Sequence, residues 1–98
     1  MNIREEQTTG FGPNNGLAPA DNYPVTKVFD GDKFLGSLRN DGYRCYNGEI
    51  VNDWVAFAGG AMVPMPAGAH TDRETAKRTL VEYAQRAAFA WKLAGVNR

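Results

Sequence analysis

Few side chains in this sequence have the types and spacing that catalysis or metal binding requires. Cys45 is the single cysteine and His70 the single histidine among the 98 residues. A structural zinc site takes four Cys or His ligands, and one isolated Cys and one isolated His do not indicate a nucleophile–base pair. Asp30 and Asp32 flank Gly31 but lack the other ligands of a calcium loop, which favours a turn. We therefore predict a protein that is not an enzyme, with no catalytic residue, metal site or cofactor.

Basic side chains gather where a C-terminal helix is predicted to begin. Residues 71–98 contain six basic and three acidic residues, whereas the rest of the chain is net acidic. Anions bind at helix N-termini, where free N–H groups and basic side chains converge. Nucleic-acid binding is therefore kept as the alternative function, through Arg73, Lys77, Arg78 and Lys92. The pI of about 6.6 argues against it, because dedicated nucleic-acid-binding domains lie above about 9.

An apolar pair on the predicted helix is the first candidate for a protein interface. Phe89 and Leu93 lie one turn apart, about 140° from the centre of the stripe predicted to face the core. Apolar anchors within a charged rim are typical of an interaction surface. This face is expected to bind another protein or a second copy of the chain, as a homodimer. The charged residues predicted around the pair are Arg78, Glu82 and Arg86.

Two alternatives to that interface remain open. Phe11 and Leu17 of the N-terminal segment could fold back and cover the apolar pair, in which case the face is internal. If the face is exposed but does not bind, the aromatic residues of the predicted sheet are the next candidates. These are Tyr43, Tyr46 and Trp54.

The C-terminal helix is predicted from Thr71 to just before Gly95. Thr71-Asp-Arg-Glu74 matches a capping box, in which the first and fourth residues satisfy each other's backbone N–H groups. Gly95 suits the left-handed conformation that commonly follows a helix. A stripe of mostly small residues, about 100° wide, is predicted to face the core. It consists of Ala76, Leu80, Tyr83, Ala84, Ala87, Trp91 and Ala94.

Short strands separated by turn signals are predicted between residues 25 and 65. The turn signals Asp30-Gly31, Asn47-Gly48 and Gly59-Gly60 recur at the spacing of hairpins. Pro64 cannot donate a ladder hydrogen bond, so the last strand is expected at a sheet edge. The predicted fold class is α+β, with a four- to five-stranded antiparallel sheet and one long C-terminal helix packed on one face. The strands are expected at residues 25–29, 33–39, 43–46, 50–57 and 61–65.

The first 22 residues are predicted to form a flexible arm, and residues 23–98 a single domain. Residues 8–22 consist mainly of Gly, Pro and Asn, which interrupt both helical and strand periodicity. Phe11 and Leu17 are the large apolar side chains of this stretch, and two are too few to offset the entropy of ordering it. Deletion of residues 1–20 is therefore expected to leave the thermal unfolding midpoint nearly unchanged.

A short meander followed by one capped helix, over residues 25–94, resembles several small modules. These include the arm-site DNA-binding domains of tyrosine recombinases and the latter part of double-stranded-RNA-binding domains, although the basic signature of neither is present. The polar arm and single small domain are similar in type to accessory proteins of bacteriophages and mobile elements, such as anti-CRISPR inhibitors, from which no site residue is carried over. We interpret the chain as a cytoplasmic binding module, an inhibitor or adaptor, with no membrane segment.

Overall fold

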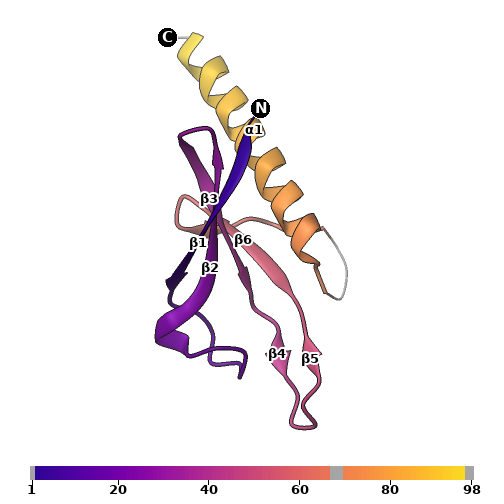
Figure 1. The fold of residues 1–98 in the computed structure, drawn as a ribbon. Coiled ribbons are helices and arrows are strands. Elements are labelled where there is room, and N and C mark those ends of the chain that lie inside the picture. The colour runs from indigo at the N-terminus through magenta and orange to yellow at the C-terminus, as the bar shows by residue number, and fades with distance from the viewer. Residues whose placement is uncertain (1, 67–69, 97–98) are drawn as a thin grey trace.

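A computed structural model describes residues 2–66 and 70–96, with the side chains of the C-terminal helix described as far as Ala88. A five-stranded antiparallel sheet in the order β1-β2-β3-β6-β7 carries one helix on one face (Figure 1). This arrangement confirms the predicted α+β class. The strands of the sheet are β1 (Ile3–Gly10), β2 (Tyr23–Asp30), β3 (Lys33–Asn40), β6 (Trp54–Ala58) and β7 (Ala61–Met62). A separate pair is formed by β4 (Tyr43–Arg44) and β5 (Ile50–Val51), a 3₁₀ turn spans Ala20–Asn22, and helix α1 is Arg73–Val96.

Strand β1 corrects the prediction that residues 1–22 lie outside the domain as an arm. All eight residues of β1 pair antiparallel with β2, from Ile3 opposite Asp30 to Gly10 opposite Tyr23. The sequence of β1 is mostly polar and charged because the strand lies at a sheet edge, where such side chains find partners outside the core. The domain therefore begins at β1, and residues 11–22 connect two neighbouring strands.

The strands β3 and β6 continue into β4 and β5 as one long antiparallel ribbon (Figure 1). The register is the same in both parts, with Asn40 opposite Trp54 and Tyr43 opposite Val51. Residues 50–57, predicted as one strand, keep a single register but are divided between two sheets at residues 52 and 53. The ribbon takes residues 43–44 out of the main sheet, and β1 supplies the fifth strand in their place.

The two edges of the sheet differ in length. At one edge, β7 contains two residues and is followed closely by Pro64, in agreement with the predicted edge position. The turn before it uses Gly59 and Gly60 at φ of 60° and 81°, a conformation that glycine adopts without strain. At the other edge, β1 contains eight residues. The sheet therefore has one short edge and one long edge.

The core lies between the sheet and the first half of α1. Leu80 approaches β3 closely because residue 36 is glycine, where an added Cβ would lie 2.8 Å from a Leu80 methyl carbon and 2.2 Å from the Phe57 carbonyl oxygen. The predicted core positions Ala76 and Leu80 are confirmed, whereas Tyr83 is 43 % exposed. Trp91 and Ala94 lie outside the described side chains. The buried cluster consists of Val28, Leu38, Ala56, Val63, Ala76 and Leu80.

The N-terminus of α1 is fixed by Asp72 rather than by the predicted capping box at Thr71. A carboxylate oxygen of Asp72 accepts a hydrogen bond of 2.7 Å from the Thr75 backbone N–H, which lowers the pKa of this carboxyl. Thr71 instead joins the loop to β6, because its N–H donates to the Asp53 carboxylate at 3.0 Å and its carbonyl accepts from the Trp54 N–H at 2.8 Å. At the other end, α1 continues through Gly95 to Val96, past the predicted stop.

Candidate functional site

Two of the four cations predicted to contact nucleic acid are bound to a carboxylate of their own domain. Arg73 donates through both of its terminal nitrogens to the carboxylate of Glu5 on β1, with the longer contact at 3.3 Å. The Lys77 ammonium lies 2.8 Å from the same carboxylate. Arg73 also lies over the ring of Trp54, 5.5 Å from its centroid. Both cations therefore serve to hold α1 against β1.

The paired carboxylate is strongly acidic in the folded protein. Hydrogen bonds from Arg73 and Lys77 lower the pKa of Glu5 from its ordinary value of 4.5 to about 2. The charged form of Glu5 is thus favoured more by the folded state than by the unfolded chain. A carboxyl whose folded pKa is depressed stabilises the fold above its unfolded pKa and loses that contribution as the pH falls toward the folded value.

Replacement of Glu5 by glutamine is expected to lower the free energy of unfolding at neutral pH by about 1–2 kcal/mol. Because the folded pKa is about 2 and the unfolded pKa about 4.5, wild type should lose this advantage between those two pH values. Urea unfolding at neutral pH and across that range measures both quantities. Glu6→Gln is the matched control, since the Glu6 side chain is 53 % exposed. Equal pH profiles for the Glu5→Gln variant and wild type would contradict the prediction.

The helix face predicted to bind a partner is described in part. The side chains of Arg78, Glu82 and Arg86 are exposed on α1. The side chains of Phe89, Leu93 and Lys92 lie outside the described residues, so the predicted interface at this end of the helix stays a prediction.

A different set of exposed apolar side chains lies at the opposite end of the molecule, on the β4–β5 ribbon and the loop before β2 (Figure 1). Tyr46 at the ribbon tip is fully exposed, and Phe11 of the loop is 82 % exposed. Tyr43 and Ile50, on the two strands of the ribbon, are about half exposed. Four of the seven exposed large apolar residues in the described chain thus lie on these two segments, with Tyr43 and Ile50 on opposite faces of the ribbon because Tyr43 pairs with Val51 and Ile50 with Arg44. We call residues 11–18 and 43–52 the hairpin–loop surface.

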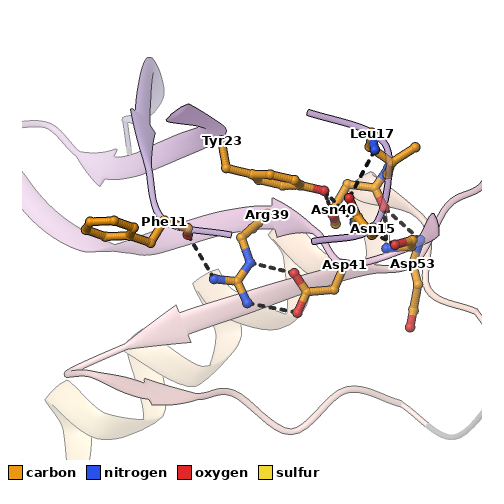
Figure 2. A network of polar contacts seen from close by, with 9 residues as sticks. Phe11, Asn15, Leu17, Tyr23, Arg39, Asn40, Asp41 and Asp53 are labelled. Carbon is orange, nitrogen blue, oxygen red and sulfur yellow. Dashed lines mark hydrogen bonds and ion pairs between the residues drawn. The ribbon is translucent and has the colours of Figure 1, made fainter. Parts of the chain in front are cut away.

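Asn15 holds the loop against the ribbon (Figure 2). Its side-chain amide donates to the Gly42 carbonyl at 2.6 Å and to the Tyr23 hydroxyl at 2.8 Å, and its side-chain oxygen accepts from the Leu17 N–H at 3.1 Å. Its backbone carbonyl accepts from the Arg44 N–H at 3.0 Å. One asparagine thus gives a glycine-rich loop a defined position beside the ribbon.

Asn40 fixes the ribbon at the point where the main sheet ends (Figure 2). Its side-chain oxygen accepts from the Gly42 N–H at 3.0 Å and the Asp53 N–H at 2.9 Å, and its amide donates to Asn52 at 2.8 Å. Its backbone carbonyl accepts from the hydroxyl of Tyr23, which is 2 % exposed. One backbone ladder bond persists here, from the Asp41 N–H to the Asp53 carbonyl at 2.8 Å, and the Asn40 side chain accepts from the Asp53 N–H in place of the second, so the start of the ribbon is held in position.

A hollow of about 260 Å³ lies between the loop, the ribbon and the sheet. Its size is below the range of about 300–1,000 Å³ that is usual for drug-sized ligands, and it fits one apolar side chain better. Ile50 and Trp54 contribute large apolar surfaces to the hollow, and the side-chain amides of Asn40 and Asn52 contribute polar groups. The lining residues are Leu17, Ala18, Tyr23, Pro24, Asn40, Ile50, Asn52 and Trp54.

Among the residues that the structure describes, no three Cys, His, Asp or Glu side chains are placed to share a metal ion. The described part of α1 is not apolar enough to form a membrane span. Comparison of the chain with protein-family models, with curated proteins and with solved structures gives no match.

Proposed function

We propose that this protein is a non-enzymatic binding module that acts on a protein partner, as an inhibitor or adaptor, through the hairpin–loop surface. The observation that carries the proposal is the exposure of Tyr43, Tyr46 and Ile50 along one short hydrogen-bonded ribbon. Exposed apolar residues that gather in one place mark interaction sites, whereas isolated ones do not. Tyrosine is also among the residues that contribute most to binding energy at interfaces.

The scaffold beneath these side chains favours binding because it is ordered in advance. Asn15 and Asn40 together fix the loop and both strands of the ribbon by hydrogen bonds. Arg39 and Asp41 form an ion pair beside them, with one contact at 2.9 Å, and this pairing raises the pKa of Arg39. A surface that is already ordered loses less conformational entropy on association. The polar network thus supports a specific contact.

The charge of the hairpin–loop surface suits a protein better than a nucleic acid. Arg44 and Glu49 are its two charged residues, and they have opposite signs. Nucleic-acid binding depends on several basic groups that neutralise phosphates. Of the cations on α1, Arg73 and Lys77 are already paired with Glu5. These observations favour the protein partner over the alternative.

The double variant Tyr46→Ser/Ile50→Ser is expected to remain folded and to lose its partner. Removing both apolar anchors from a surface centre typically weakens binding by more than about 100-fold. Affinity capture from the native host, followed by mass spectrometry and then by titration of the captured protein, measures this loss. The matched control is Phe34→Ser/Tyr83→Ser, which removes two large apolar side chains elsewhere that are about half exposed, as Ile50 is.

Three results would overturn the proposal. Equal binding of the captured protein by wild type and the Tyr46→Ser/Ile50→Ser variant would place the interface elsewhere, with Phe89 and Leu93 as the next test. Loss of binding in the Phe34→Ser/Tyr83→Ser control alone would also place the interface outside the hairpin–loop surface. Capture of nucleic acid, with an affinity that falls steeply as salt rises, would favour the alternative function.

A further inference from the structure

In the part of the chain that the structure describes, no strand pairs with the outer side of β1, which forms the long edge of the sheet. The backbone carbonyl of Asn2 accepts a hydrogen bond of 2.8 Å from the Gly31 N–H, so these two residues form a hydrogen-bonded pair. Such pairs alternate along an antiparallel ladder, which assigns the even-numbered residues of β1 to bonding with β2. The odd-numbered residues turn their N–H and C=O groups away from the sheet. They are Ile3, Glu5, Gln7 and Thr9.

A hollow lies beside this edge on the face that α1 covers. It has a volume of about 390 Å³ and lies between Ile3 of β1 and the side chains of Lys77, Arg78 and Val81 on α1. A further strand added to β1 would turn every second side chain toward the face on which this hollow lies, because side chains alternate between the two faces of a sheet. The edge thus offers free backbone groups and also space for the side chains of an added strand.

We infer that β1 pairs antiparallel with β1 of a second copy of the chain, across a two-fold axis. Three registers place at least three odd-numbered residues of each β1 opposite odd-numbered residues of the other, and they are centred on Glu5, Glu6 or Gln7. The register centred on Glu6 opposes two like charges on the exposed face, and the one centred on Gln7 opposes Glu6 to Thr8. The register centred on Glu5 places Arg4 of each copy opposite Glu6 of the other, and we assign the dimer to it.

Charges on the exposed face complement each other in this register. Arg4 and Glu6 lie on the face opposite α1 and form an ion pair within one chain, with side chains that are 40 % and 53 % exposed. In the dimer, two such pairs face each other and the four charges alternate in sign. Opposite charges directly across a strand pair stabilise it. Arg4 and Glu6 therefore pair with each other within one chain and, in this register, also with Glu6 and Arg4 of the second copy.

The charges on the helix face also allow this register. The two Glu5 side chains lie opposite each other at the axis, but each is bound to Arg73 and Lys77 of its own α1. Two acidic groups are thus surrounded by four basic ones, and their mutual repulsion is offset. The backbone groups of residues 3, 5 and 7 of both copies complete the ladder. The dimer does not use the hairpin–loop surface, so the two proposals can fail separately.

The test is the mass of the full chain in solution, by analytical ultracentrifugation over a roughly hundredfold range of concentration up to about 1 mM. Wild type should approach twice the chain mass of 10.7 kDa. Arg4→Glu and Glu6→Arg each oppose like charges across the axis, and each should weaken the dimer by at least about tenfold. An equimolar mixture of these two variants should recover it, because residue 4 of one then faces residue 6 of the other with opposite charge.

Lys33→Glu is the matched control, since it makes the same charge change as Arg4→Glu at the exposed first residue of β3 and should dimerise like wild type. Circular dichroism checks that every variant is folded. A wild type that stays monomeric at about 1 mM would overturn the inference. So would a dimer that Arg4→Glu and Glu6→Arg leave intact, or a mixture of the two variants that stays monomeric.

Discussion

Deletion of residues 2–10 is expected to lower the thermal unfolding midpoint by more than about 10 °C, or to unfold the domain. The deletion removes the eight-residue ladder with β2 and turns β2 into an edge strand. It also removes Glu5, which leaves Arg73 and Lys77 without their shared carboxylate. Net contributions of about 0.5–1.5 kcal/mol per hydrogen bond add up to several kcal/mol over such a strand. Differential scanning calorimetry of the truncated and full chains measures the change.

Two point variants in the connecting segment separate the role of β1 from that of the residues after it. Phe11→Ser and Leu17→Ser change the large apolar side chains of residues 11–22 and leave β1 intact. Phe11 is 82 % exposed, so its replacement should change the free energy of unfolding by no more than about 0.5 kcal/mol. A truncated chain that melts within about 8 °C of wild type would show that β1 contributes little and would restore the flexible arm.

Leu80→Ala is expected to lower the free energy of unfolding by roughly 2–5 kcal/mol. Leu80 is fully buried and packs in the cluster between β2, β3, β6 and α1. The Leu80 methyl groups fill the space above Gly36, where an added Cβ would lie 2.8 Å from one of them, so their removal leaves a cavity between α1 and β3. The total free energy of unfolding of a small domain is about 5–15 kcal/mol, so this loss is a large share of it. Chemical denaturation followed by circular dichroism measures it.

Glu82→Ala is the control for this prediction, because Glu82 lies on the exposed side of the same helix. It should change the free energy of unfolding by less than about 0.5 kcal/mol. If Leu80→Ala were as stable as Glu82→Ala, the helix would have to pack on the sheet through another face. Trp91, predicted from the sequence to lie in the core, would then be the first residue to test.

The elements that could be predicted from the sequence are those with a strong local signal. Glycine at the turn positions predicted the hairpins, and the helical spacing of Ala76 and Leu80 predicted the side of α1 that meets the sheet. β1 could not be found in this way, because Arg4, Glu5 and Glu6 show no apolar alternation. Its place depends on pairing with β2 and on ion pairs with a helix nearly 70 residues away.

The candidate site was harder to predict because it depends on which side chains the fold leaves uncovered. From the sequence, Tyr43 and Tyr46 could be named only as second candidates for an interface. Both tyrosines lie beyond the end of the main sheet, where the Asn40 side chain accepts from the backbone N–H groups of Gly42 and Asp53. Nothing in the spacing of residues 40–53 distinguishes such an asparagine from an ordinary turn residue.

The short edge at β7 limits how far copies of this chain can assemble. Two residues followed closely by Pro64 leave almost no ladder for another strand. A sheet with two long edges could add copies at both ends and grow into a ribbon, whereas this sheet has one long edge, at β1. Pairing there is isologous and closes the assembly at two copies. The protein should therefore stay in solution at concentrations where a chain with two open edges would polymerise.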